Sequence, residues 1–370
     1  MKHFVLAPDS FKGTMDAQLI CKLEKEAITA RFPDAKVTCI PMADGGEGMV
    51  SAYMGIMGGE TVSVTVTGPL GTPVEAVYGI LPDGSAVMEM AAAAGLPYAL
   101  GHEDPMHTTT YGVGQMILHA KAQGVKKILL GLGGSATNDC GIGMAAALGW
   151  RFLDDQGREV EPLACNLGKI HTILEPEVPL DLQIRAACDV DNPLLGSRGA
   201  TYTFGPQKGA TEEMLPLLEA GMTGYARVLE AHKNLPGGTE APGSGAAGGM
   251  GAAVRMLFGG ELLAGAELLL DSVGFDSLLQ ETDFVFTGEG RMDWQSAYGK
   301  VPGAIARRCQ KAKVPCIALC GALGQGAEKL YDIGVTAMFS AVRGACSFEQ
   351  IQKTCQEDLS LLTASVLRLL

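Results

Sequence analysis

The chain has 370 residues, of which 47% are hydrophobic and 6% aromatic, and it contains 50 glycines. This length predicts two or three domains with enough apolar side chains for sizeable cores. The balance of 41 acidic against 28 basic side chains gives a net charge of −13, which repels phosphate backbones and anionic lipids. Nucleic acids and membranes are therefore excluded as expected partners.

The ten cysteines are scattered along the chain. The closest pair, Cys316 and Cys320, fits neither a zinc motif nor a disulfide framework. The N-terminal segment MKHFVLAPDS has too short an apolar run for a signal peptide. These features predict reduced thiols in a cytoplasmic protein.

The first part of the chain alternates between strands and helices. Residues 3–7 read as a buried strand, followed by a polar loop and a helix that begins near Thr14. Residues 36–41 form a second predicted strand, followed by the loop MADGGEG and a helix from about Met49. A strand–loop–helix pattern repeated in this way is typical of a parallel sheet.

The pattern changes near Gly68. Residues 60–69 and 74–90 alternate between polar and apolar side chains around a Pro-Asp-Gly turn, which predicts antiparallel hairpin strands. Further along, residues 111–123 and 212–232 read as helices, and residues 126–132 and 182–190 as strands.

Strand–loop–helix units return from Asp283 to the C-terminus. The predicted fold class is therefore α/β, with a discontinuous Rossmann-like parallel-sheet domain built from residues 1–67 and 282–370. A second, mixed α/β domain, residues 68–281, is inserted into it. We expect the active site in the cleft between the two domains.

The polar loops that follow the predicted strands share one composition, because each combines carboxylates with glycine, hydroxyl or lysine side chains. In open parallel sheets, ligands bind beyond the carboxyl ends of the strands. We therefore expect a common site built from Asp9, Ser10, Lys12, Asp44, Glu47, Gly133, Gly134, Ser135, Thr137, Asn138, Asp139, Asp189, Asp191, Asn192, Glu289, Arg291, Asp293, Gln295, Ser296 and Lys300.

The segment GLGGSATNDCG, residues 131–141, lies before a predicted helix. Glycines at the start of a helix let backbone N–H groups approach an anion, and hydroxyl groups add donors. The alternative is a helix cap whose glycines serve tight packing. The phosphate-binding interpretation assigns nucleotide contacts to Gly133, Gly134, Ser135, Thr137 and Asn138.

Two other glycine-containing motifs give weaker signals. Lys208 in GPQKGA is either a further phosphate contact or a surface lysine. The segment GSGAAG, residues 243–248, matches a dinucleotide-binding pattern, but no clear strand precedes it. A flexible loop that closes over a ligand is the preferred interpretation of that segment.

Asp189 and Asp191 follow a predicted strand with a spacing that places both carboxylates on the same side. Such a pair can hold Mg²⁺, or one member can act as a general base. A solvated turn before Pro193 is the alternative.

Taken in order, the motifs APDSFKGT, PMADGGEG, GLGGSATNDCGIGMAAALG, ACDVDNPLLGSRGAT, FGPQKGA, PGSGAAGGMG and TGEGRMDWQSAYGK resemble those of the type I glycerate kinases. Individually the glycine-rich segments are common, but the ordered set is specific. The resemblance implies ATP-dependent phosphorylation of D-glycerate with Mg²⁺. It also implies a discontinuous Rossmann-like domain with an inserted α/β domain.

Phosphoryl transfer needs cations around the phosphates and a metal held by carboxylates. Glu289 and Asp293 are the candidate metal ligands. Lys300 stands at the start of a predicted helix, where a cation is unfavourable unless an anion is bound nearby. We therefore place Lys300 with Asp189 and Asp191 in the predicted catalytic group.

The carboxylate of glycerate needs a cation of its own, for which Lys12 and Arg291 are the candidates. Asp9 and Ser10, which precede Lys12, complete the predicted substrate-binding group.

Several functions and states stay open at this point. The expected product is 2-phosphoglycerate, with 3-phosphoglycerate as the nearest alternative. A non-catalytic protein that binds a sugar acid or a nucleotide is a further alternative, and a nicotinamide-dependent oxidoreductase rests on GSGAAG alone. The sequence does not determine the oligomeric state, and a homodimer is one option.

Overall fold

The structure is a computed structural model that describes residues 1–42, 48–297 and 300–370. The chain divides into two compact units. Unit 1 comprises residues 1–44 and 264–370, and unit 2 comprises residues 45–263. The predicted arrangement, in which both chain ends build one domain and the middle of the chain builds another, is confirmed.

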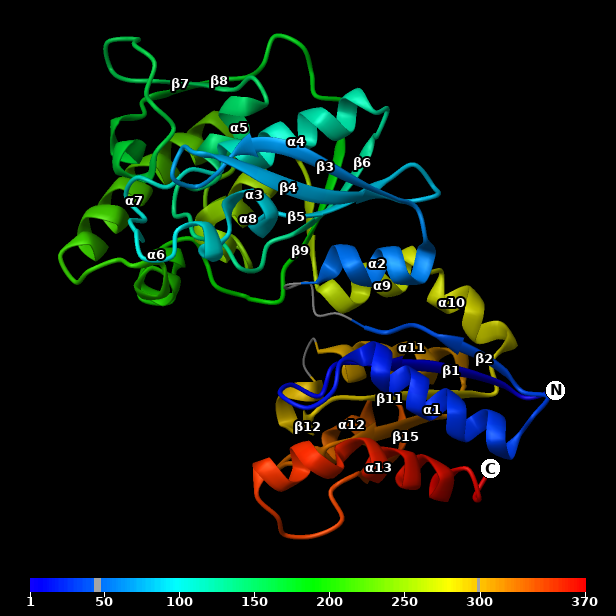
Figure 1. Cartoon of the computed structure of the whole chain (residues 1–370). Coiled ribbons are helices and arrows are strands. Elements are labelled where there is room, and N and C mark those ends of the chain that lie inside the picture. Colours follow the sequence, from blue (N-terminus) through cyan, green and yellow to red (C-terminus); the bar gives the residue numbers. More distant parts are fainter. Residues whose placement is uncertain (43–47, 298–299) are drawn as a thin grey trace. The chain divides into compact units, whose positions relative to one another are not determined.

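Unit 1 contains a five-stranded sheet with the order β15-β13-β11-β1-β2, in which all neighbouring strands are parallel (Figure 1). The central pair, β1 and β11, comes from opposite ends of the chain, with Phe4 opposite Phe284. The strands are β1 (His3–Pro8), β2 (Lys36–Cys39), β11 (Phe284–Gly288), β13 (Cys316–Cys320) and β15 (Val335–Ser340).

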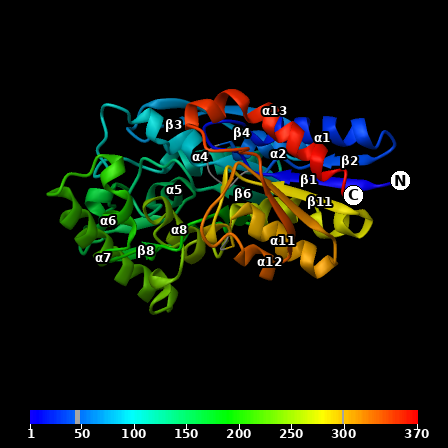
Figure 2. The same ribbon diagram turned by 90° about the horizontal axis from the view of Figure 1, so that it is seen from below.

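Helices cover both faces of this sheet, with α1 and α13 on one face and α11 on the other (Figures 1 and 2). The core between the sheet and α1 and α13 includes Phe4, Leu6, Ile20, Phe286 and Leu359, none of which is exposed. The helices of unit 1 are α1 (Ala17–Arg31), α9 (Gly265–Ser272), α10 (Phe275–Leu278), α11 (Val301–Ala312), α12 (Lys329–Asp332) and α13 (Phe348–Val366). Two short strands, β12 (Arg291–Met292) and β14 (Ala322–Leu323), pair beside the sheet.

Unit 2 contains a six-stranded mixed sheet with the order β10-β9-β6-β5-β4-β3. Strands β3 and β4 are antiparallel, as the alternating pattern predicts, and the other strands run parallel from β5 to β10. The strands are β3 (Glu60–Thr67), β4 (Pro73–Ile80), β5 (Ala86–Glu89), β6 (Lys127–Gly131), β9 (Gln183–Ala187) and β10 (Glu261–Leu263), with a separate hairpin of β7 (Arg151–Leu153) and β8 (Thr172–Leu174).

The helices of unit 2 pack around a core that includes Tyr78, Met116, Leu130, Tyr225 and Val254, all without exposed surface. Long-range packing of this kind holds short helices that would be unstable alone. The helices are α2 (Met49–Met57), α3 (Ala91–Ala94), α4 (Tyr111–Ala122), α5 (Ile142–Ala147), α6 (Ala200–Phe204), α7 (Met214–Lys233) and α8 (Ala246–Met256).

The boundaries of the units differ from the predicted ones at 67/68 and 281/282. The first boundary lies earlier because β3 pairs along its whole length with β4 and so belongs to unit 2. The second lies earlier because α9 contacts α11 of unit 1, where Arg308 Nη2 lies 2.7 Å from Asp271 Oδ1. Both shifts result from contacts between residues distant in sequence.

Candidate functional site

In unit 1 the loops after β1 and β11 lie side by side. The amide of Asp9 donates to the carbonyl of Gly288 at 2.8 Å. A Cβ atom added at Gly290 would lie 3.2 Å from the Cα atom of Phe11, so only glycine permits this approach without displacement. The predicted substrate-binding residues Asp9, Ser10 and Lys12 therefore lie next to the segment that contains Glu289.

The side chains of the first loop differ in exposure. Asp9 Oδ1 accepts a hydrogen bond from the amide of Ser10 at 2.7 Å, which fixes the start of the loop. Lys12 is exposed to solvent. An exposed ammonium group on an ordered loop suits the recognition of a small anion.

Glu289 lies at the end of β11 and is only 7% exposed. Its carboxylate accepts a short hydrogen bond from the hydroxyl of Ser296. Lys300 Nζ lies 3.5 Å from its other oxygen. The segment thus folds back on itself, and Ser296, Lys300 and Glu289 form one cluster.

Asp293 and Arg291 lie on the same segment. Asp293 Oδ1 accepts a hydrogen bond from the amide of Gln295 at 2.9 Å, and the amide of Asp293 donates to Ser296 Oγ at 3.0 Å. Gly324 lies against both residues, since a Cβ atom there would be 3.0 Å from Arg291 Nε and 3.0 Å from Asp293 Cβ. These contacts determine the backbone path of residues 291–296 after β11.

Burial raises the pKa of Glu289, and the nearby charge of Asp293 also raises it, while Ser296 and Lys300 lower it. Two carboxylates that repel one another are a suitable environment for a divalent cation. Mg²⁺ prefers oxygen ligands and is usually held by one or two carboxylates together with water and substrate phosphates. The oxygen donors of Glu289 and Asp293 therefore fit Mg²⁺. Among the described residues, no group of three or more His, Cys, Asp or Glu side chains is arranged to hold a metal ion.

Lys300 is the N-cap residue of α11 and has an extended backbone with φ −80° and ψ 165°. Its side chain is 42% exposed, and its Nζ lies 3.5 Å from Glu289 Oε2, a long ionic contact. The N-terminus of α11 and the ammonium group together favour an anion at this position.

In unit 2 the segment 133–139 after β6 passes from the surface into the core. Gly134 is exposed and has φ +72°, a conformation that favours glycine, whereas Ser135 is 6% exposed and Thr137 and Asn138 are fully buried. The amide of Ala136 donates to the carbonyl of Ala94. The accessible part of the predicted phosphate loop is therefore residues 133–134.

The start of α5 already has a carboxylate bound to it. Asp139 is fully buried and accepts hydrogen bonds from the amides of Gly141 and Gly143, at 3.2 Å each. It also accepts hydrogen bonds from Thr110, from the amide at 2.8 Å and from the hydroxyl at 2.7 Å. Asp139 thus occupies the position at the helix N-terminus where the motif alone predicts a phosphate, and the cap interpretation describes this half of the segment.

The segment GSGAAG is packed in the interior of unit 2, so its interpretation as a flexible closing loop is wrong. A Cβ atom at Gly248 would lie 2.1 Å from the carbonyl oxygen of Thr137, and the carbonyl of Gly248 accepts the amide of Cys140 at 2.9 Å. No strand leads into it, because the short helical segment η4 (Gly238–Glu240) lies upstream. Its glycines allow close packing against the segment 133–139.

Lys208 belongs to the short helix η3 (Pro206–Lys208) and is 2% exposed. Its ammonium group donates to the carbonyl oxygen of Thr137 at 2.6 Å. A side chain buried in this way is neither the surface lysine nor the direct phosphate contact that the sequence suggests.

Asp189 and Asp191 lie beyond the end of β9 at Ala187, so the predicted strand geometry does not extend to them. Both are exposed. Asp191 is paired with Arg198, whose Nη2 lies 3.1 Å from Asp191 Oδ1. The further candidates Asp44 and Glu47 lie outside the described residues.

One residue that sequence reasoning missed is Glu89, at the end of β5. Its Oε1 accepts hydrogen bonds from the amides of Gly48 at 2.6 Å and Met49 at 3.1 Å, and so caps the start of α2. A carboxylate at the end of a strand was the available signal, but the apolar neighbours of Glu89 made the segment look like core.

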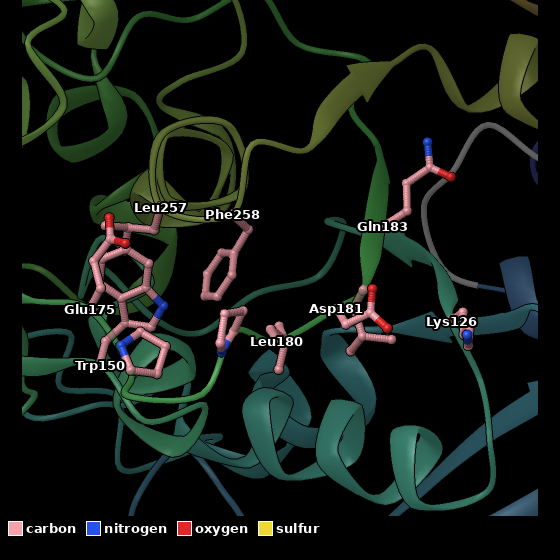
Figure 3. Close-up of a pocket in the computed structure, with 11 residues that line it drawn as sticks. Lys126, Trp150, Glu175, Leu180, Asp181, Gln183, Leu257 and Phe258 are labelled. Carbon is pink, nitrogen blue, oxygen red and sulfur yellow. The ribbon is translucent and has the colours of Figure 1, made fainter.

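The structure also contains a surface pocket of about 530 Å³ in unit 2, lined by Trp150, Leu180 and Phe258 among others (Figure 3). Gln183 begins β9 and Lys126 precedes β6, and both line this pocket. The pocket therefore lies at the amino ends of these strands, opposite to the loops described above. None of the described helices is long and apolar enough to cross a membrane.

Comparison with known proteins identifies the relatives of the chain. Residues 4–370 match the family model described as the glycerate kinase family. A Bacillus cereus protein named glycerate kinase is 40% identical over 375 residues, covering 98% of this chain and 96% of its own. An Escherichia coli protein named glycerate 2-kinase is 37% identical, covering 96% of this chain and 94% of its own.

The fold has a close counterpart among solved structures. The crystal structure named for glycerate kinase 2 from Salmonella typhimurium LT2 aligns with a TM-score of 0.85 and 38% identity. The alignment covers 99% of this chain and 97% of that one. The similarity thus extends over both units.

Proposed function

The chain belongs to the glycerate kinase family and is a phosphotransferase, and we propose that it transfers the γ-phosphoryl group of ATP to the 2-hydroxyl of D-glycerate. The kinase family implies ATP as the donor. The choice of the 2-hydroxyl follows the relative named glycerate 2-kinase, and transfer to the 3-hydroxyl is the alternative.

The observation that carries the proposal is the cluster of Glu289, Ser296 and Lys300 between β11 and α11. It combines a buried carboxylate with an ammonium group at a helix N-terminus. Loose transition states of phosphoryl transfer place negative charge on the transferred group, and catalysis depends on positioning and on cations. A lysine that can exchange its long contact with Glu289 for a phosphate oxygen meets that requirement.

We assign the metal ion to Glu289 and Asp293. Mg²⁺ bound there would neutralise charge on the phosphates. Ser296 positions Glu289 by donating to its carboxylate, and the amide of Gln295 positions Asp293 by donating to its Oδ1. These contacts hold both carboxylates before any ligand arrives.

The remaining roles follow from exposure and charge. Lys12 and Arg291 are exposed cations of unit 1, suited to the carboxylate of glycerate. Asp189 is the proposed general base for the acceptor hydroxyl, and Asp191 is the alternative. Gly133 and Gly134, the accessible part of the segment after β6, are the proposed contacts to phosphate in unit 2, with the hydroxyl of the adjacent Ser135 as a further donor. The expected location of the active site between the two domains stays a prediction.

The proposal is tested by incubating the protein with ATP, Mg²⁺ and D-glycerate and identifying the product by ³¹P and ¹H NMR. We expect 2-phosphoglycerate and stoichiometric ADP. The 3-phosphate would overturn the choice of hydroxyl, and an absence of ADP formation with D-glycerate and a panel of short hydroxy acids would overturn the kinase assignment. When Lys300 is replaced to test its role, Lys311→Met serves as the control for surface charge, because Lys311 is an exposed lysine further along α11.

A further inference from the structure

Lys208 is among the largest side chains that are fully buried in the described part of the chain. Burying an ammonium group is unfavourable unless it is hydrogen-bonded and its charge is compensated. Its Nζ donates to the carbonyl oxygen of Thr137 at 2.6 Å, and the buried Asp139 supplies the opposite charge. The cation therefore lies directly behind the segment 133–139, on its interior side.

The contact has a geometric consequence for the segment. In a trans peptide the C=O and N–H groups of one peptide plane point in opposite directions. Because the carbonyl of Thr137 points toward Lys208, the amide N–H of Asn138 points away from it. The carbonyl of Ala136 likewise accepts the hydroxyl of Thr108 at 3.3 Å, which turns the amide of Thr137 away from that hydroxyl.

The same segment carries polar atoms that lack partners. Thr137 Oγ1 and Asn138 Oδ1 are buried without a hydrogen-bond partner among the described residues. Native proteins leave few buried polar atoms unpaired, and those that remain unpaired often mark a functional strain or a bound group. The backbone of the segment is thus held by hydrogen bonds from the interior of unit 2, while the side-chain oxygens of Thr137 and Asn138 make no hydrogen bond to the described residues.

We propose that Lys208 is a positioning residue for phosphate binding. From inside unit 2 it holds the buried end of the segment 133–139 at Thr137, so that the accessible residues 133–134 keep the conformation that receives the anion, and its positive charge lowers the cost of placing an anion there. This inference rests on the proposed function, and it replaces the direct contact that the sequence suggests. Charge acts across a buried peptide more strongly than through water.

The titration of Lys208 supports this assignment. Burial lowers the pKa of Lys208 to about 7, and the charge of Asp139 opposes part of that shift. Among the described residues, the ammonium donates to the carbonyl of Thr137 and interacts with the charge of Asp139, and Tyr225 from α7 and Cys140 interact with that same carboxylate. An anion bound at the segment would favour the protonated form, so binding should take up a proton near neutral pH.

The test compares the wild type with Lys208→Met, which keeps the length of the side chain and removes its charge. Equilibrium binding of ATP and the KM values for ATP and D-glycerate are measured from pH 6.5 to 9. We expect Lys208→Met to weaken binding of one of the two by tenfold or more at pH 6.5, with a smaller effect on kcat. In the wild type, binding of that ligand should weaken as the pH rises above about 7. In Lys208→Met the affinity should no longer depend on pH in this range.

Two controls keep the outcome decisive. Lys169→Met removes an exposed lysine of unit 2 that donates to Asn166, and it should change neither constant. If Lys208→Met does not fold, Lys208→Gln, which retains a donor for Thr137 without the charge, replaces it. A folded variant that binds ATP and glycerate within twofold of the wild type at every pH would overturn the inference. A wild type that binds ATP but does not phosphorylate glycerate would refute the proposed function alone, because the binding comparison would still stand.

Discussion

In unit 1 the segment after β11 keeps Arg291 and Lys300 exposed, whereas in unit 2 the segment after β6 encloses Asp139 completely. Both segments are glycine-rich, carry acids and precede a helix, so by composition they look alike. The difference lies in what satisfies the charges. Asp139 takes four hydrogen bonds from its own unit, while Lys300 makes a long contact and stays 42% exposed.

This comparison separates two uses of an ionisable side chain. A carboxylate surrounded by backbone donors stabilises the local fold and has little capacity left for a ligand. A partly exposed lysine at a helix N-terminus can move to a substrate phosphate at low cost. The comparison predicts that equivalent substitutions in the two segments affect different measurable quantities.

The largest effect is expected for Asp189→Asn, at an exposed position beyond the end of β9. If Asp189 is the general base, turnover should fall by roughly 10²–10⁴-fold, because general base catalysis typically contributes that much. The thermal midpoint should not change, since the side chain is exposed. Steady-state kinetics measures this effect. If the variant retains more than about a tenth of wild-type turnover, Asp189 is not the general base. Asp191→Asn is then the next variant to measure.

Lys300→Met should reduce kcat by about 10²-fold, the usual scale for removing one group that stabilises charge in a transition state. The KM for glycerate should change less, because charge on the phosphoryl group is met most strongly in the transition state. Lys311→Met on the same helix is the matched control. Unchanged turnover in Lys300→Met would show that this exposed lysine does not act on the phosphoryl group, and the comparison between the two segments would fail.

Asp139→Asn tests the buried side. An amide can accept fewer of the four hydrogen bonds and brings two donors of its own, so the free energy of unfolding should fall by about 1–3 kcal/mol. Chemical denaturation measures this loss. If the folded variant is as stable as the wild type but has lost turnover, Asp139 acts in catalysis and the contrast between the two segments fails.

The smallest effect is expected for Ser296→Ala. Burial raises the pKa of Glu289, so activity that depends on its ionised form should fall as the pH drops through a value above the ordinary glutamate range. The hydrogen bond from Ser296 lowers that pKa, so its loss should move the acidic limb of the pH–rate profile to higher pH. A limb that does not move would mean that another group controls the profile.

The backbone conformation of Gly134 limits what the variant Gly134→Val can show about phosphate binding. Because Gly134 has φ +72°, any larger residue there strains the backbone whatever the loop binds. A raised Michaelis constant in Gly134→Val would therefore not by itself indicate that the loop contacts phosphate. Ser135→Ala, at an adjacent position with negative φ, removes a hydroxyl without that strain.

Much of this protein could be predicted from its sequence, because the signals are local. Strand–loop–helix repeats at both ends predicted the parallel sheet that β1 and β11 share, and the alternating residues 60–69 predicted β3. The ordered motifs predicted the family. The cluster around Glu289 lies within one short segment, so its members were all visible together in the sequence.

The tertiary structure alone decided which of these residues lie inside. Lys208 reaches Thr137 across 71 positions of sequence, and Gly248 packs on the same residue from 111 positions away, so no local pattern reveals that both enclose the segment 133–139. Burial depends on such distant contacts, and burial in turn decides whether a charge holds the fold or remains available to a ligand. The boundaries of the units shifted for the same reason, since the pairing of β3 with β4 and the ion pairs of Arg308 depend on partners that the local sequence does not specify.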